Sequence, residues 1–299
     1  MATTTQAAPR ATDRRPGRGA RWWAEVGWKH LLALVVIAFC VFPILYILSA
    51  SLNPGGTLTG SNALFAKVSF DNYARLFGGT QFPQWLMHSF IVSTVTALGT
   101  VLMGACAAYA FSRFRFAGRR GGLTALLIVQ MFPQMLAFVA IFLLLLMLGE
   151  IYPFLGLESL WGLIAVYLGG ALGANTFLMY GFFNTIPKEL DEAARIDGAT
   201  HAQVFWRVIM RLVTPILAVV GLLSFVSSYG EFILAKLVLA RPENYTLAVG
   251  LYVWASDERN APWSLFAAAA VVAAIPIIIL FMYLQKYIVA GLTAGGVKG

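Results

Sequence analysis

Charge and catalytic side chains are scarce in this sequence. Only 11% of its 299 residues are charged, against roughly 25% in ordinary soluble domains. Cys40 and Cys106 lie in apolar segments, where cysteine behaves as a small hydrophobic residue, so they indicate neither a disulfide framework nor a metal site. The three histidines lack ligand spacing, and no H-E-x-x-H, G-x-S-x-G or phosphate-loop motif occurs. We therefore expect a chain that is not an enzyme and binds no cofactor itself.

Apolar residues, in contrast, make up 60% of the sequence and raise its mean hydropathy to +0.77. Residues 31–52 and 123–149 contain no Asp, Glu, Lys or Arg. Each stretch is longer than the ~20 residues that an α-helix needs to cross a bilayer. The sequence therefore predicts an all-α polytopic membrane protein.

About six spans are expected, at residues 31–51, 85–111, 123–148, 160–182, 212–234 and 262–290. Residues 1–25 are rich in Ala, Thr, Pro and Arg and predict a disordered basic tail, which leaves residues 26–299 as the transmembrane domain. A cleaved signal peptide is the alternative for the first span. Its apolar core is too long and no A-x-A site follows it, which favours an uncleaved anchor.

Basic residues are concentrated on one side of the predicted membrane. Six spans place both termini on the same side, together with the second-to-third and fourth-to-fifth loops. That side carries Arg10, Arg14, Arg15, Arg18, Arg21, Lys29, Arg113, Arg115, Arg119, Arg120, Lys188, Arg195, Arg207, Arg211, Lys286 and Lys298. The other side keeps Lys67, Arg75, Lys236, Arg241 and Arg259. The asymmetry predicts cytoplasmic termini in contact with anionic lipid, and no nucleic-acid partner, because no basic cluster is interleaved with stacking aromatics.

Several polar residues lie inside the predicted spans. Gln130, Gln134 and Asn175 place amides at membrane depth, where they either bond across helices or line a pore. Gly169 and Gly173, four residues apart, favour the close approach of a neighbouring helix.

Glu231 lies near the outer end of the fifth span. A carboxylate there must face a partner or water, not lipid. It is either an interfacial residue that reaches the outer water or a polar element of a gate.

The segment 185–215 is an unusually long polar loop between two predicted spans. Pro187 suits a first helical turn, and acidic residues follow it where they favour a helix N-terminus. Gly198 permits a sharp change of direction. A second helix is expected to lead back to the fifth span, because Phe205, Ile209 and Leu212 follow at positions i, i+4 and i+7.

A docking surface is expected on the first helix of this loop. Leu190, Ala193, Ala194 and Ile196 leave little side-chain bulk to keep another protein at a distance. The alternative is a solvated amphipathic hairpin that only caps the bundle.

The same loop contains Glu192-Ala193-Ala194, then Gly198 within Asp197-Gly198-Ala199, and later Pro215. In this pattern the chain resembles the membrane subunits of ATP-binding-cassette importers, and it is most similar to the smaller permease of maltose-type importers. The resemblance covers nearly the whole chain. Further stretches that carry it are Asp71–Tyr73, Ala108–Phe111, Gln130–Pro133, Tyr167–Gly170, Tyr245–Gly250 and Gly291–Gly299.

This resemblance implies a cytoplasmic coupling helix, formed around Glu192, Ala193, Ala194, Asp197, Gly198 and Ala199, that contacts a separate ATPase subunit. The tail residues Gly295, Gly296, Val297, Lys298 and Gly299 are expected to reach between two copies of that ATPase. ATP and Mg are then used by the partner subunits.

The other implied partners are a second permease subunit and an extracytoplasmic sugar-binding protein, and the implied location is the bacterial cytoplasmic membrane. Maltose or maltodextrin is the first expected substrate, with trehalose or another carbohydrate as alternatives. A secondary transporter is disfavoured, because no ionisable residue lies at the predicted midplane and the two halves do not repeat.

Overall fold

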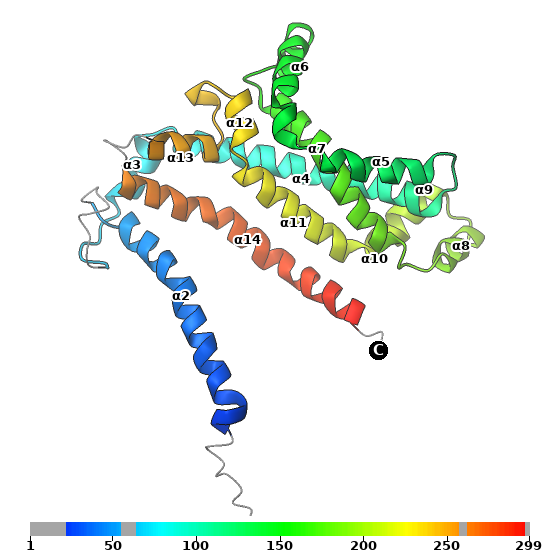
Figure 1. The fold of residues 1–299 in the computed structure, drawn as a ribbon, viewed down its shortest axis with the longest axis horizontal. Helices are drawn as coiled ribbons and strands as arrows, with labels where there is room; N and C mark the ends of the chain where they lie inside the picture. The colour runs from blue at the N-terminus through cyan, green and yellow to red at the C-terminus, as the bar shows by residue number, and fades with distance from the viewer. Residues whose placement is uncertain (1–21, 55–63, 257–261, 297–299) are drawn as a thin grey trace, which may run out of the picture.

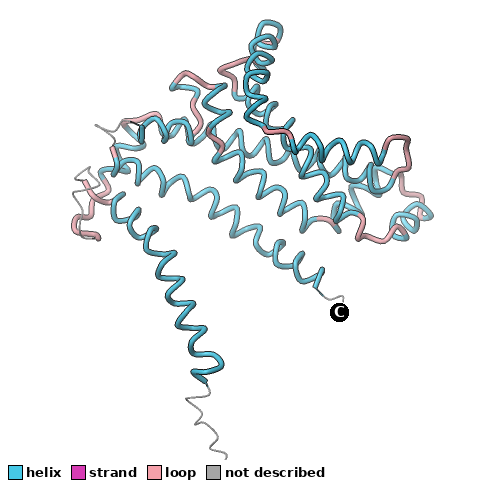
Figure 2. The backbone as a smooth tube through the Cα atoms, in the orientation of Figure 1, coloured by secondary structure: helices cyan, strands magenta, loops and turns pink. Residues whose placement is uncertain are grey.

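The computed structural model describes residues 22–54, 64–256 and 262–296, and every regular element in these ranges is a helix (Figure 2). This confirms the predicted all-α fold class. Four long helices form the bundle: α4 (Phe82–Arg113), α7 (Leu160–Phe183), α11 (Thr214–Gly230) and α14 (Trp263–Gly296). Helix α4 packs against α7 and α11, and α14 packs against the other side of α11 (Figure 1). Helix α2 (Trp28–Ser51) starts away from the bundle and approaches α14 at its C-terminal end (Figure 1).

The described residues contain five helical segments that are long and apolar enough to cross a membrane: Glu25–Ser51, Phe82–Arg113, Gln134–Ile151, Leu160–Phe183 and Trp263–Tyr287. A sixth candidate is the pair His201–Leu212 and Thr214–Gly230, which is bent by 78°. The prediction of about six membrane helices therefore agrees with the fold, although two of them differ from their expected form.

The third expected span, residues 123–148, is not one helix. It consists of α5 (Arg119–Met131), the 3₁₀ turn η3 (Gln134–Ala137) and α6 (Phe138–Ile151). Phe132 has an extended backbone with ψ 129°, because the ring of Pro133 disfavours the helical conformation of the residue before it. Helix α6 consequently leaves the bundle in a new direction (Figure 1).

The fifth expected span, residues 212–234, ends earlier than predicted. Helix α11 stops at Gly230, and Glu231 is extended with φ −69° and ψ 127°. The chain then forms α12 (Ile233–Val238), the 3₁₀ turn η6 (Pro242–Asn244) and α13 (Leu247–Ser256) before it enters α14.

The two ends of the chain also differ from expectation. The π-helical turn η1 covers Trp23–Gly27, so the last residues of the tail expected at 1–25 are helical, and residues 1–21 lie outside the described residues. At the other end α14 continues to Gly296, so Gly295 and Gly296 belong to a helix. Val297, Lys298 and Gly299 lie outside the described residues.

The remaining helices are short and lie in the connections. They are α3 (Asp71–Gly78), η4 (Pro153–Leu155), α8 (Glu189–Ile196), α9 (His201–Gln203), η5 (Val204–Ile209) and α10 (Met210–Leu212).

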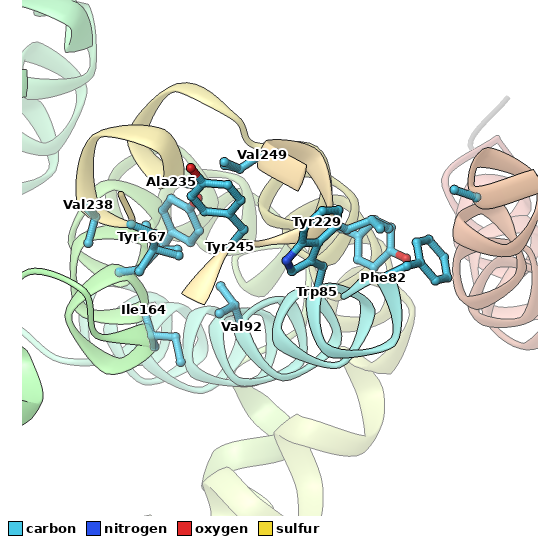
Figure 3. Packing of buried hydrophobic residues seen from close by; sticks show 14 of the residues in the cluster. Phe82, Trp85, Val92, Ile164, Tyr167, Tyr229, Ala235, Val238, Tyr245 and Val249 are labelled. Carbon is cyan, nitrogen blue, oxygen red and sulfur yellow. The ribbon is translucent and has the colours of Figure 1, made fainter. Parts of the chain in front are cut away.

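The larger hydrophobic core lies where α4 and α7 meet the segment that follows α11 (Figure 3). The ring centroids of Trp85 and Tyr245 are 6.2 Å apart, and the Trp85 indole donates a hydrogen bond of 2.8 Å to the carbonyl of Pro242. Glu158 accepts hydrogen bonds from the backbone amides of Ala240 and Arg241. These bonds hold the η6 segment against the α4–α7 end of the bundle.

Candidate functional site

A cavity of about 970 Å³ opens between α5, α6, α7, α11 and α12. Gln130, Gln134, Asn175 and Glu231, the four polar residues predicted to serve a pore or gate, all line it. They come from four different elements: α5, η3, α7 and the end of α11. The break at Pro133 brings Gln134 to this wall, because η3 starts directly after it.

The amides differ in how strongly the protein holds them. Gln130 Nε2 donates to the carbonyl of Gly170 on α7 at 3.1 Å, whereas Asn175 Nδ2 donates to Ala171 O of its own helix at 2.9 Å. A Cβ atom on Gly173 would lie only 2.3 Å from Gln130 Nε2, while one on Gly169 would meet no atom within 4 Å. The expected close approach is therefore made at Gly173 alone, and it accommodates a side chain.

Glu231 holds the break between α11 and α12. Its carboxylate accepts a hydrogen bond of 2.6 Å from the Tyr167 hydroxyl and bonds of 2.9 Å from the backbone amides of Leu234 and Ala235. A carboxylate at this position satisfies amides at the start of α12 and interacts favourably with its dipole. The Glu231 side chain is therefore bonded by its own chain at the cavity wall.

Two further polar residues of this cavity were not anticipated from the sequence. Tyr167 is buried and donates to Glu231. The Thr96 side chain is buried on α4, and its hydroxyl has no hydrogen-bond partner among the described residues. Threonine is common in membrane helices, so no sequence signal marked Thr96.

The loop at residues 185–215 lies at the opposite end of α7 from the η6 segment (Figure 1). Its first helix, α8, carries Glu189, Asp191 and Glu192 in the first turn, as the sequence predicted. Gly198 has a φ of +84°, a left-handed conformation that glycine adopts without steric cost. The predicted change of direction at Gly198 is confirmed.

The six predicted coupling residues do not share one face. Glu192, Ala193, Asp197 and Gly198 are exposed. Ala194 and Ala199 are partly buried against a second hydrophobic core, which we call the loop core: Ala105, Ala108, Tyr109, Met179, Phe183, Ile186, Val204, Phe205, Ile209, Val213, Ile216 and Val220. Leu190 and Ile196 also lie at the surface, with 43% and 86% of their areas exposed.

The second half of the loop begins with a capping box between Thr200 and Gln203. The expected second helix is present as α9, η5 and α10. Phe205 and Ile209 are buried in the loop core, whereas Leu212 is 45% exposed and Val213 is buried. Within this segment η5 is a π-helical turn. Such a turn holds an extra residue and rotates the positions that follow it.

Arg113, the last residue of α4, connects this loop to the bundle. Its Nε lies 2.5 Å from Oδ2 of Asp191 on α8, and its other nitrogens donate to the carbonyls of Phe183 and Ile186. The Arg113 and Asp191 side chains are only 5% and 13% exposed. Burial raises the pKa of the Asp191 carboxyl, and the Arg113 guanidinium opposes that rise. The sequence contained the basic residue but no sign of this pair.

No group of three or more His, Cys, Asp or Glu side chains among the described residues is placed to hold a metal ion. The geometry instead combines a membrane cavity with an exposed helix at one end of the bundle.

Proteins of known function resemble this chain over nearly its full length. The galactooligosaccharides transport system permease protein GanQ of Bacillus subtilis is 41% identical over 93% of this chain and 98% of its own length. The maltodextrin permease protein MdxG of the same species is 39% identical over 90% and 93%. The maltose/maltodextrin permease protein MalG of Escherichia coli K12 is 42% identical over 90% and 95%.

A solved structure has the same fold. A chain of a bacterial ABC transporter that imports the acidic polysaccharide alginate aligns with a TM-score of 0.75 at 24% identity. The alignment covers 91% of this chain and 98% of that one.

The family profile described as binding-protein-dependent transport system inner membrane component matches residues 100–294, which include α8 and most of the cavity. The resemblance expected from the Glu192-Ala193-Ala194 motif is thereby confirmed. This chain belongs to the family of binding-protein-dependent transport system inner membrane components.

Proposed function

We propose that this chain is one permease subunit of an ATP-driven importer of maltodextrin-type oligosaccharides and forms half of its translocation pathway. The observation that carries the proposal is 39–42% identity, over at least 90% of the chain, to permeases named for maltose, maltodextrin and galactooligosaccharides. Such a subunit needs a surface for the ATPase and a path for the substrate. We call the exposed residues Glu192, Ala193, Asp197 and Gly198, on α8 and the turn after it, the α8 surface. The cavity supplies the path.

The chemistry of the cavity supports a neutral sugar. Its polar groups are mainly amides and hydroxyls, and none of its lining residues in the described chain is basic. The one carboxylate, Glu231, already accepts three hydrogen bonds from the chain. An acidic ligand would find no cationic partner there, whereas hydroxyl groups can bond to amides and hydroxyls.

Coupling to ATP requires partners. Two copies of a cytoplasmic ATPase subunit bind and hydrolyse ATP with Mg, and the exposed residues Glu192, Ala193, Asp197 and Gly198 contact one copy. Leu190 and Ile196 add apolar surface for that contact. The tail residues Gly295, Gly296, Val297, Lys298 and Gly299 reach between the ATPases.

A second permease subunit covers the apolar helices α2 and α6, whose side chains are largely exposed in the isolated chain. An extracytoplasmic binding protein delivers the sugar from the other side. Both termini of this chain are cytoplasmic, and the complex resides in the bacterial cytoplasmic membrane.

Uptake in proteoliposomes that contain the whole importer tests the proposal. We expect ATP-dependent uptake of maltotriose with the cognate binding protein, and no uptake of an acidic oligosaccharide of similar length. A galactooligosaccharide belongs in the same assay, because GanQ is named for that substrate. ATP-independent uptake driven by a proton gradient would contradict the proposal.

The α8 surface is tested by Glu192→Lys and Gly198→Val. We expect either change to uncouple uptake or to release the ATPase while the chain still inserts in the membrane. Valine at a φ of +84° is strained, and lysine reverses an exposed charge. Arg120→Gln is the matched control, because Arg120 is exposed in the first turn of α5, on the same predicted side. Normal uptake by both loop variants would contradict the coupling role.

A further inference from the structure

One guanidinium group joins α8 to two other segments at the end of the bundle. Arg113 Nε approaches Asp191 Oδ2 at 2.5 Å, while Nη1 donates to Phe183 O at 3.3 Å and Nη2 donates to Ile186 O at 3.2 Å. The two carbonyls belong to the last residue of α7 and to the turn that follows it. Arg113 therefore joins three segments: α4, the end of α7 and α8.

The Arg113–Asp191 contact is an attraction between charges. Neither Arg113 Nε nor Asp191 Oδ1 has a hydrogen-bond partner among the described residues. Both atoms are shielded from water, so the charges are screened less than on an open surface. Removing either partner would leave a buried charge without compensation.

A second bond supports the same junction. Ser112 Oγ, next to Arg113 on α4, donates to Asn184 Oδ1 at the C-terminal end of α7 at 2.9 Å. The end of α4 is thus anchored both to the last turn of α7 and to α8. A displacement of α8 would therefore act on the end of α4 as well as on residues 184–188.

Helix α4 extends from this junction to the cavity. It is continuous from Phe82 to Arg113, and Thr96, on the cavity wall, lies roughly 25 Å from Arg113 at the rise of an α-helix. The same helix packs against α7 and α11, which line the cavity as well. Rigid secondary elements are among the structures that carry coupling between distant sites.

We propose that Arg113 is a positioning residue that links α8 to α4 through Asp191 and so transfers the movement of α8 to the cavity. The inference rests on the proposed function, in which the ATPase moves α8. It assigns the transfer to the buried ion pair between Asp191 and Arg113, and Arg113 belongs to α4, outside the loop that contacts the ATPase.

The test uses the complete importer in proteoliposomes and measures sugar uptake, ATP hydrolysis and the ATPase retained on purification. For Arg113→Gln and Asp191→Asn we expect the ATPase to remain bound and hydrolysis to stay near the wild-type rate. Sugar transported per ATP should fall about tenfold, the size of a typical coupling change. Arg113→Lys should retain part of the coupling, because it keeps the charge but not the three-way geometry.

The double variant Arg113→Gln with Asp191→Asn separates a pair from two independent roles. A pair predicts no loss beyond that of the worse single variant, whereas independent roles predict multiplied losses. Arg120→Gln is the control for a lost basic residue and should leave the transport ratio unchanged.

An unchanged ratio of sugar to ATP in both single variants would overturn the inference, and so would multiplied losses in the double variant. Loss of the ATPase from both single variants would overturn it as well, because Arg113 would then support docking. These results differ from failure of the proposed function, in which the wild-type complex itself would show no ATP-dependent uptake.

Discussion

Two partly or largely buried carboxylates occupy opposite ends of the bundle and are held in different ways. Asp191 on α8 faces the cation Arg113 from a separate helix. Glu231, after α11, is held by the neutral Tyr167 hydroxyl and by two backbone amides within four residues of its own position. The first carboxylate is paired with a charge, and the second is satisfied by dipoles.

This difference indicates different tasks. A charge pair between distant segments fails when either partner is lost, so it makes the position of α8 depend on α4. The Glu231 carboxylate is held mainly by nearby backbone amides, so it stabilises the conformation of its own segment. Its hydrogen bond with Tyr167 is its connection to α7. The position of α8 is thus constrained by an ion pair between residues that are far apart in the sequence. The break between α11 and α12 is stabilised mainly by hydrogen bonds from neighbouring backbone amides.

The largest effect is expected for Asp191→Ala. This change leaves Arg113 buried without its counter-charge, which should destabilise the folded protein by about 3–5 kcal/mol. The melting temperature of the purified complex measures the loss. Asp71→Ala is the matched control, because Asp71 is exposed in the first turn of α3, and its melting temperature should stay near wild type. Equal shifts for the two variants would remove the distinction drawn for Asp191.

A smaller effect is expected for Glu231→Ala. Two amides at the start of α12 and the Tyr167 hydroxyl lose their acceptor, at a cost of about 2 kcal/mol. The melting temperature again reports the change, with Glu243→Ala as control because Glu243 is exposed in the neighbouring segment. A loss as large as that for Asp191→Ala would show that the two carboxylates are equally critical.

The conservative change Glu231→Gln distinguishes two roles of Glu231: hydrogen-bond acceptor for the amides at the start of α12, and element of a gate in transport. Glutamine keeps one acceptor oxygen at the cavity wall, so we expect a loss of roughly 1 kcal/mol and nearly normal sugar uptake. Unchanged uptake would remove the gate interpretation of Glu231. A strong fall in uptake at an unchanged melting temperature would instead assign the carboxylate a role in the transport cycle.

The smallest effect is expected for Tyr167→Phe. Only one donor disappears, and both amide bonds to Glu231 remain, so the loss should be about 0.5–1 kcal/mol. Comparing this variant with Glu231→Gln in the same melting assay tests whether local amides dominate. A greater loss of stability for Tyr167→Phe than for Glu231→Gln would mean that the hydrogen bond to α7 is the main stabiliser of the break between α11 and α12.

Local patterns predicted those features that depend on a few neighbouring residues. The apolar run from residue 31 to residue 52 predicted α2, since a helix satisfies every backbone group without water. Gly198 predicted a turn because only its own backbone had to adopt the left-handed conformation. The Glu192-Ala193-Ala194 motif predicted the family for the same reason: its residues are adjacent in the chain.

Features that depend on distant residues could not be predicted in the same way. Pro133 was visible, but whether it kinks a helix or divides it depends on the neighbours of α6. Leu212 is exposed after the π-helical turn η5, a turn that the spacing of Phe205, Ile209 and Leu212 did not indicate. The four polar residues of the cavity were named individually, yet nothing in their spacing indicated that they line one wall.

The sequence by itself therefore determined the helical class, the family and the identity of the exposed loop, because bilayer hydrophobicity and turn geometry act on contiguous residues. Only the tertiary structure decided which polar groups are paired. Arg113 and Asp191 are far apart along the chain, and so are Tyr167 and Glu231. A buried charge or hydroxyl takes its partner from whatever the fold brings within reach.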